Sequence, residues 1–87
     1  MKKLKEDAFL VYVPIPKPSF LSEECECIGV FDGEKRWKSM DKKRIFTWDG
    51  LHGEIEVFNN RGRHLGVLEP QNGMLIKPAI KGRKIDV

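Results

Sequence analysis

The sequence predicts a mainly β fold of the α+β type, a small and highly twisted antiparallel β-sheet with a short N-terminal helix. Three observations lead to this prediction. The 87 residues are enough for one domain with a thin core. From Arg36 onward, runs rich in β-branched and aromatic residues alternate with turns rich in glycine and asparagine. These runs are short and regularly spaced, which is typical of a meander whose strands twist strongly.

The β-rich region is predicted to contain four strands. The clearest is Glu54 to Phe58, where charged and apolar residues alternate, so that Glu54, Glu56 and Phe58 share one face of the sheet. The turn at 59–62 contains two asparagines and a glycine, which favours a hairpin. The predicted strands are 43–48, 54–58, 64–68 and 74–77, and the glycine-bracketed segment 49–53 connects the first two.

The first twenty residues are predicted to form a proline-rich, extended strap. Phe9 to Val13 favours a short strand, and Pro14, Pro16 and Pro18 then impose an extended path. Ser19 or Ser22 is a candidate N-cap for a short helix within residues 19–28. Residues 29–35 are predicted to be a loop, with a turn at Asp32-Gly33.

Charge is unevenly distributed along the chain. Residues 1–34 carry four Lys and Arg against seven Asp and Glu, whereas residues 35–87 carry twelve against six. A basic surface attracts polyanions, of which RNA and DNA are the commonest. A solvated basic surface without such a partner explains the same balance.

Other functional classes are disfavoured by composition. No apolar run is long enough to span a bilayer, and residues 1–13 do not resemble a secretory signal peptide. The two cysteines, Cys25 and Cys27, are too close for an unstrained disulfide and too few for a closed zinc site. We therefore expect reduced thiols, and neither a metal nor another cofactor.

The segment from Trp48 to Glu56 gathers one imidazole and three carboxylates in nine residues. Cleavage of RNA without a metal needs a base for the 2′-hydroxyl, an acid for the leaving oxygen and a cation for the phosphate. His52 and Glu56 are candidates for acid and base, and Asp49 is a candidate to orient His52. A nearby carboxylate favours the protonated, acid-ready form of a histidine. Arg83 or a neighbouring lysine is the candidate cation.

Aromatic and basic residues complete the predicted site. Phe46, Trp48 and Phe58 are able to stack on unpaired bases. The predicted RNA-contacting residues are Trp48, Glu54, Phe58, Lys81 and Lys84.

Each of these assignments has a structural alternative. A single histidine between glycines is usually a loop residue, and an arginine in a basic tail is usually solvated. Glu54 and Glu56 would also fit the solvent face of a hairpin, paired with Arg61, Arg63 or Lys77. Trp48 and Phe58 are more often core residues than base platforms. His64 is interpreted as structural or RNA-contacting rather than catalytic. At the level of the whole domain, a non-catalytic RNA-binding module and a protein-interaction domain remain alternatives.

Several motifs, in order and at near-constant spacing, resemble the cytotoxic domain of the E-group ribonuclease colicins. The most specific are the W-D-x-x-H-G-E-x-E run over residues 48–56 and His64-Leu65-Gly66. The resemblance covers roughly residues 11–87. Its further matches are Arg36-Trp37, Ile45-Phe46-Thr47, Pro70 with Gly73, and the P-x-P-K segment at 14–17.

The resemblance implies a fold, an activity and partners. Members of that family are small, twisted antiparallel sheets with a short N-terminal helix, and they cleave one phosphodiester of 16S ribosomal RNA in the decoding centre without a metal. An acidic immunity protein holds them inactive in the producer. By this resemblance Asp49, His52, Glu56 and Arg83 fall on the family's catalytic residues, and Arg83 does so if one residue is inserted before it.

The resemblance also implies how the protein is organised and delivered. We expect one cytotoxic domain over 1–87, with a strap over 1–20 and a catalytic sheet over 36–87. It would be made in a bacterial cytoplasm, delivered to a target bacterium and active there, as a monomer or a 1:1 complex with its inhibitor. Relative to the family pattern, we expect a domain without a translocation region of its own, and the sequence differs in having Cys25 and Cys27 and a shorter turn at 59–62.

Overall fold

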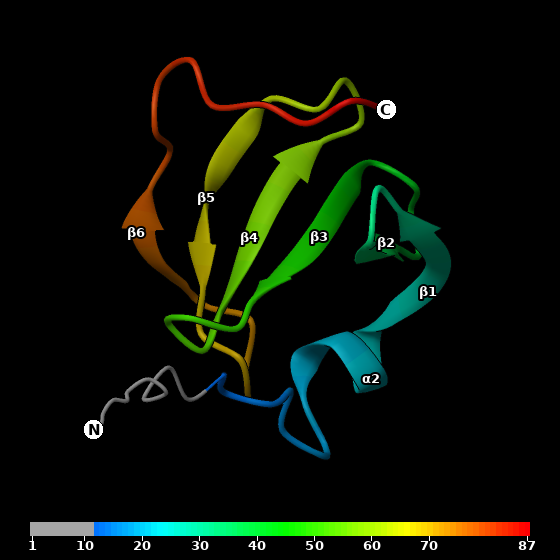
Figure 1. Cartoon of the computed structure of the whole chain (residues 1–87), viewed down its shortest axis with the longest axis vertical. Helices are drawn as coiled ribbons and strands as arrows, with labels where there is room; N and C mark the ends of the chain where they lie inside the picture. Colours follow the sequence, from blue (N-terminus) through cyan, green and yellow to red (C-terminus); the bar gives the residue numbers. More distant parts are fainter. Residues whose placement is uncertain (1–11) are drawn as a thin grey trace, which may run out of the picture.

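The computed structural model describes residues 12–87, which fold around one six-stranded antiparallel sheet. The strands lie in the sheet in the order in which they occur in the chain, so each one pairs only with its sequence neighbours (Figure 1). The predicted class, mainly β with a short helix near the N-terminus, is confirmed. The elements are α2 (Phe20–Glu24), β1 (Cys25–Phe31), β2 (Glu34–Ser39), β3 (Arg44–Asp49), β4 (Glu54–Asn59), β5 (His64–Leu68) and β6 (Leu75–Pro78).

Helix α2 is shorter than the segment predicted for it. Ser19 is the N-cap, and its hydroxyl and that of Ser22 each accept a hydrogen bond from the other residue's backbone N–H. The helix ends at Glu24 because the next residues belong to strand β1, whose first residue, Cys25, is buried in the core.

The loop predicted over residues 29–35 is wrong, because β1 and β2 form a hairpin there. Only Asp32 and Gly33 lie outside the two strands, and both have positive φ, 53° and 78°. Two positive φ angles in a two-residue connection are what a tight hairpin of strongly twisted strands requires. The turn itself was predicted correctly, but the hairpin around it was not.

One face of the sheet carries the main hydrophobic core. Antiparallel partners such as Trp37 and Phe46, or Trp48 and Ile55, lie opposite each other and therefore point to the same face. Helix α2 and the strap pack on this face through Phe20 and Ile15. The buried cluster is Leu21, Cys25, Trp37, Phe46, Ile55, Val57 and Leu68.

The opposite face carries the candidate site. Glu56 pairs with Thr47 on β3 and with Val67 on β5, so these three side chains form one cross-strand row. Glu54, Glu56 and Phe58 share this face, as the alternation in β4 predicts. Beneath the polar groups lies a second layer of buried side chains: Ile45, Phe58, His64 and Val67.

The C-terminal tail covers one end of this second face. In Figure 1 the tail runs across the ends of β4 and β5. Backbone hydrogen bonds join the N–H of His64 to the carbonyl of Arg83, and the N–H of Ile85 to the carbonyl of Gly62. Arg36, buried on β2, donates from Nη1 to the carbonyl of Asp86 at 2.6 Å. The tail is therefore ordered along the β4–β5 hairpin, and Arg83 is held with it.

The remaining predictions for the N-terminal part and the cysteines have mixed outcomes. Tyr12 to Pro16, the described beginning of the strap predicted over residues 1–20, form neither helix nor strand. Most of the strand predicted over Phe9 to Val13 lies outside the described residues. Both cysteines are free thiols, Cys25 buried and Cys27 exposed. Within residues 12–87 no helix is long and apolar enough to cross a membrane.

Candidate active site

Asp49 is the last residue of β3 and organises the turn that carries His52. Its Oδ1 atom accepts hydrogen bonds from the backbone N–H groups of Leu51 (3.0 Å) and His52 (3.2 Å). Its Oδ2 atom lies 2.8 Å from Nδ1 of the His52 ring. An aspartate that accepts from the backbone two and three residues ahead is a common way of closing a turn. The same carboxylate therefore fixes both the turn and the imidazole.

The pKa of the Asp49 carboxyl lies below its ordinary value. Partial burial works against ionisation and is the largest single influence, but hydrogen bonds from the His52 ring and from the backbone of His52 and Leu51 together outweigh it, and the net shift is downward. Asp49 is therefore ionised at neutral pH and accepts a hydrogen bond from His52 Nδ1. Within residues 12–87 no hydrogen bond involves the other ring nitrogen, Nε2, and the His52 side chain is 66% exposed.

Glu56 lies near the middle of β4 and is bound by two donors. Its Oε1 atom is 2.7 Å from Nε2 of His64 and 2.8 Å from Nη1 of Arg83. The Glu56 side chain is 13% exposed and that of Arg83 is 45% exposed. Within residues 12–87 no side-chain hydrogen bond reaches Oε2 of Glu56, so this oxygen is the one available to a substrate.

His64 is fully enclosed, and its protonation state follows from its neighbours. The backbone N–H of Ile80 donates to Nδ1 at 2.9 Å, so Nδ1 carries no proton. The ring N–H is therefore on Nε2 and donates a hydrogen bond to Oε1 of Glu56. A carboxylate held by a histidine and by an arginine keeps a fixed orientation.

Two hollows meet at Arg83. The smaller, about 230 Å³, is lined by Asp49, Glu56 and Arg83, with further walls from Tyr12, Glu34, Thr47, Trp48, Gly50 and Leu51. The larger, about 830 Å³, lies beneath the C-terminal tail and contains five cationic side chains. These are Arg61, Arg63, Lys81, Arg83 and Lys84, and no acidic residue lines this hollow. The candidate acid–base residues thus adjoin a positively charged surface suited to phosphate groups.

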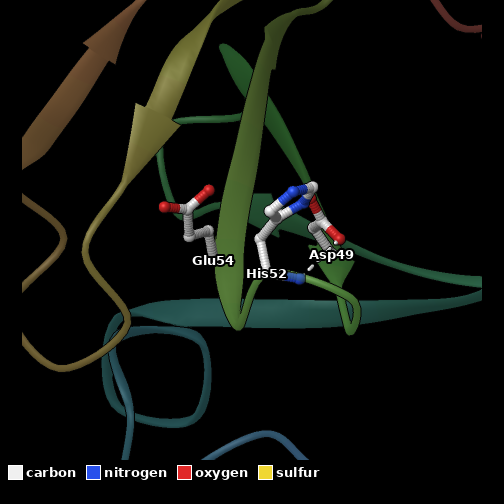
Figure 2. Close-up of side chains that lie close together, drawn as sticks. All are labelled: Asp49, His52 and Glu54. Carbon is white, nitrogen blue, oxygen red and sulfur yellow. Dashed lines mark hydrogen bonds and ion pairs between the residues drawn. The ribbon is translucent and has the colours of Figure 1, made fainter. Parts of the chain in front are cut away.

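Asp49, His52 and Glu54 are close enough to be considered as ligands of a cation. One ligand atom from each lies within 4.8 Å of the others, and Figure 2 shows them around the β3–β4 turn. Asp49 Oδ2 and His52 Nδ1 bind each other, and Glu54 Oε1 is bound to Lys77 Nζ at 3.1 Å.

Comparison with known proteins assigns the chain to a family. The family model described as Cytotoxic matches residues 28–86, which is more than half of the chain. The chain belongs to the Cytotoxic family. The resemblance to the cytotoxic domain of ribonuclease colicins is thereby confirmed, and the chain is a colicin-type toxin domain.

Curated relatives of this Cytotoxic domain come from Escherichia coli. Cloacin is 40% identical over 43 residues, which is 48% of this chain and 8% of cloacin. Colicin E3 is 39% identical over 44 residues, or 49% of this chain and 8% of the relative. Colicin-E6 is 40% identical over 43 residues, with 48% and 8% covered. The aligned stretch thus spans less than a tenth of each of these relatives.

The four predicted catalytic residues of the Cytotoxic domain lie close to one another. Asp49, Glu56 and Arg83 line one hollow, and His52 is bound to Asp49. Asp49 and Glu56 are diagonal neighbours across the β3–β4 ladder, because Asp49 lies opposite Glu54; this places their Cα atoms roughly 7–8 Å apart. The solvated tail considered as the alternative for Arg83 does not match its ion pair with Glu56.

The predicted RNA-contacting residues fall into three groups: lysines at the basic hollow, a glutamate in an ion pair, and aromatic residues that are packed against other side chains. Lys81 and Lys84 line the basic hollow. Glu54 pairs with Lys77 across the sheet, which is the alternative proposed for it from the sequence. Phe58 is only 3% exposed and packs edge-on against His64. Trp48 packs against the core and donates from Nε1 to the carbonyl of Val13. The two aromatic side chains therefore support the site from beneath.

The sequence predicts a structural or RNA-contacting role for His64, which its burial and hydrogen bonds fit, but it does not reveal that His64 binds Glu56 or that Tyr12 lines the hollow. His64 follows the β4–β5 turn and lies opposite Phe58, on the face that carries Glu56. The face could be read from the alternation in β4, but the register could not, because it shifts by one residue between Val57 and Phe58. Nothing in the sequence near Tyr12 indicates that the strap reaches the β3–β4 turn.

Proposed function

We propose that this Cytotoxic domain is an endoribonuclease that cleaves 16S ribosomal RNA in the decoding centre of the bacterial ribosome and so blocks translation. The observation that carries this proposal is the arrangement of Asp49, Glu56 and Arg83 around one hollow, with His52 bound to Asp49. Acid, base and cation are the three groups that metal-independent cleavage of RNA requires. Membership of the Cytotoxic family supports the same activity.

The proposed reaction is an attack by the RNA on its own phosphate. Oε2 of Glu56 removes the proton of a 2′-hydroxyl, and the 2′-oxygen forms a bond to the adjacent phosphorus. The bond from phosphorus to the 5′-oxygen breaks, and His52 gives that oxygen a proton from Nε2. The products are a 2′,3′-cyclic phosphate and a 5′-hydroxyl. The step consumes no metal, water or redox partner.

The remaining residues act on charge and orientation. Arg83 contacts the phosphate in the transition state, when the negative charge of the phosphate is spread over the equatorial oxygens. The planar guanidinium group of Arg83 can bind two of these oxygens at once. Asp49 accepts a hydrogen bond from Nδ1 and orients the protonated His52 ring, so that the Nε2 proton is the one given to the leaving oxygen. His64 positions Glu56. The exchange of roles between His52 and Glu56, with His52 as base, is the competing assignment for this reaction.

The basic hollow supports proposals about partners. Five cations beside the site would attract the ribosomal RNA backbone and steer association. The same charge suits an acidic immunity protein bound in a 1:1 complex within the producing bacterium. We propose that the domain is delivered from that cell and acts in the cytoplasm of a target bacterium.

The proposal is tested by incubating intact bacterial ribosomes with the purified chain and separating the RNA on a gel. We expect one short fragment from the 3′ end of 16S RNA. The Glu56→Gln variant should cut about 10²- to 10⁴-fold more slowly, since it keeps the shape of the side chain without its basicity. Glu26→Gln is the matched control, because Glu26 is exposed on β1 and pairs only with Lys42 on the surface.

One double variant and the behaviour of the wild-type chain separate the proposal from a non-catalytic alternative. The double change His52→Ala with Glu56→Ala should abolish cleavage and leave ribosome binding. A folded wild-type chain that binds ribosomal RNA in a salt-dependent way without cutting it would instead favour the non-catalytic RNA-binding module, for which the basic hollow is the specific support.

A further inference from the structure

The strap brings Tyr12 to the wall of the active site. The backbone N–H of Val13 donates to the carbonyl of Gly50 at 2.7 Å, and Nε1 of Trp48 donates to the carbonyl of Val13 at 2.8 Å. Val13 is thus bound through both its N–H and its carbonyl, once to the β3–β4 turn and once to β3. Tyr12, the preceding residue, is held beside Gly50 as a result.

Gly50 provides the space that the Tyr12 ring occupies. A Cβ atom at Gly50 would overlap three atoms of the ring, Cδ2, Cε2 and Cζ. Gly50 does not have positive φ, so glycine is needed here for room rather than for backbone conformation. Any side chain at position 50 would therefore displace the ring and leave the turn able to form.

The ring is also open to solvent at the place where the substrate would lie. Tyr12 is 66% exposed although it rests against the turn. It lines the hollow that contains Asp49, Glu56 and Arg83. Within residues 12–87, Phe58 is buried and Trp48 is bound to the strap, so Tyr12 is the accessible aromatic ring lining this hollow.

We propose that Tyr12 contacts the substrate by stacking on an unpaired nucleobase next to the scissile phosphate. The inference rests on the proposed ribonuclease function and deepens it by naming a base-binding residue. A flat aromatic ring binds any base through its face, and a fixed ring loses little entropy on doing so. Tyr12 would thereby hold the nucleotide so that its 2′-oxygen is aligned for attack.

The experiment measures initial rates of cleavage over a range of concentrations of intact bacterial ribosomes. Tyr12→Leu keeps an apolar side chain but no stacking face, and we expect its kcat/KM to fall roughly 5- to 100-fold, which is the range for loss of one stacked base. Tyr12→Phe should retain activity within about 2-fold, because it keeps the ring. Met40→Ala, which removes a side chain of equal exposure from the β2–β3 turn, is the control and should not change the rate.

A double-mutant cycle shows whether Gly50 acts through the ring. Gly50→Ala should lower kcat/KM about as much as Tyr12→Leu does. The double variant should have nearly the same kcat/KM as Tyr12→Leu alone, because both changes remove the same ring contact. Wild-type kinetics for Tyr12→Leu would overturn the proposal, and so would equal losses for Tyr12→Phe and Tyr12→Leu. A wild-type chain that does not cut ribosomes at all would overturn the proposed function itself, which is a different result.

Discussion

Nε2 of His64 lies 2.7 Å from Oε1 of Glu56, and the histidine side chain has no exposed surface. Because the N–H of Ile80 occupies Nδ1, the ring has one remaining proton and one place to donate it. This buried pair connects the acid–base site to the C-terminal tail, since Ile80 and Arg83 both belong to that segment and Arg83 binds the same oxygen of Glu56.

Removing the His64 ring should therefore lower both stability and turnover. In His64→Ala the Ile80 N–H and Glu56 each lose a buried hydrogen-bond partner. Each loss should lower the free energy of unfolding by about 1–3 kcal/mol. We expect kcat to fall while KM changes little, because the ring positions Glu56 and does not contact RNA. His64→Gln, which keeps a donor, should recover part of kcat. Urea unfolding and ribosome cleavage together would check this, and a KM effect alone would contradict it.

The shape of the Arg83 side chain should matter as well as its charge. Arg83→Ala should slow cleavage about 10²- to 10³-fold, the usual loss when one donor to a developing anion is removed. Arg83→Lys should recover only part of this, because a lysine cannot bind Glu56 and a phosphate through a planar fork. Lys81→Ala is the comparison, since its loss should raise KM and weaken the salt dependence without changing kcat. Equal activity of the Arg83→Lys variant and the wild-type chain would disprove the role.

Asp49 should contribute stability that is lost in acid. Its pKa is lowered in the folded chain, so its contribution is fully present above the ordinary aspartate value of about 3.9 and declines as the pH falls through the folded pKa. Asp49→Asn should be less stable than the wild type at pH 7, and the difference should shrink by pH 3. Chemical unfolding at both pH values measures this. If the difference in the free energy of unfolding between the wild type and Asp49→Asn grew in acid, the prediction would be wrong.

The two thiols should react at very different rates. Burial, together with the charge of Glu24, raises the pKa of the Cys25 thiol to about 11, whereas Cys27 is exposed. At pH 8 the folded chain should therefore take up one iodoacetamide group, at Cys27. Mass spectrometry of the intact chain, with Cys27→Ser as the control, reads this directly. A second group added without denaturant would show that Cys25 is accessible.

The parts of the fold that were predictable from sequence are those that depend on local pattern. The alternation of Glu54 to Phe58 predicts β4 and its faces, and the glycines at 50 and 53 predict the β3–β4 turn. Strand β1 was missed because its glutamate and glycine are depleted in strands, and because the strand is irregular between Cys27 and Gly29.

The contacts that complete the site depend on distant segments and left no local signal. His52 and Asp49 are three residues apart, so their pairing could be anticipated. Arg83 reaches Glu56 across 27 residues because the tail is bound at Gly62, where φ is 85° and any Cβ would overlap the carbonyl oxygen of Ile85. Neither periodicity nor charge reveals such a contact.

The simple strand order has a consequence for how the domain folds. Since every strand pairs with its neighbour in sequence, the sheet can grow hairpin by hairpin with small loop-closure costs, which favours rapid folding. The strap is joined to the sheet across 35 residues, between Val13 and Trp48, and Arg36 binds the tail across 50 residues. We therefore expect the sheet to assemble first and cleavage activity to appear later. Refolding would be followed in parallel by a spectroscopic signal of strand formation and by cleavage activity. Two different rates would confirm this order, and a single shared rate would show that the sheet and the active site form together.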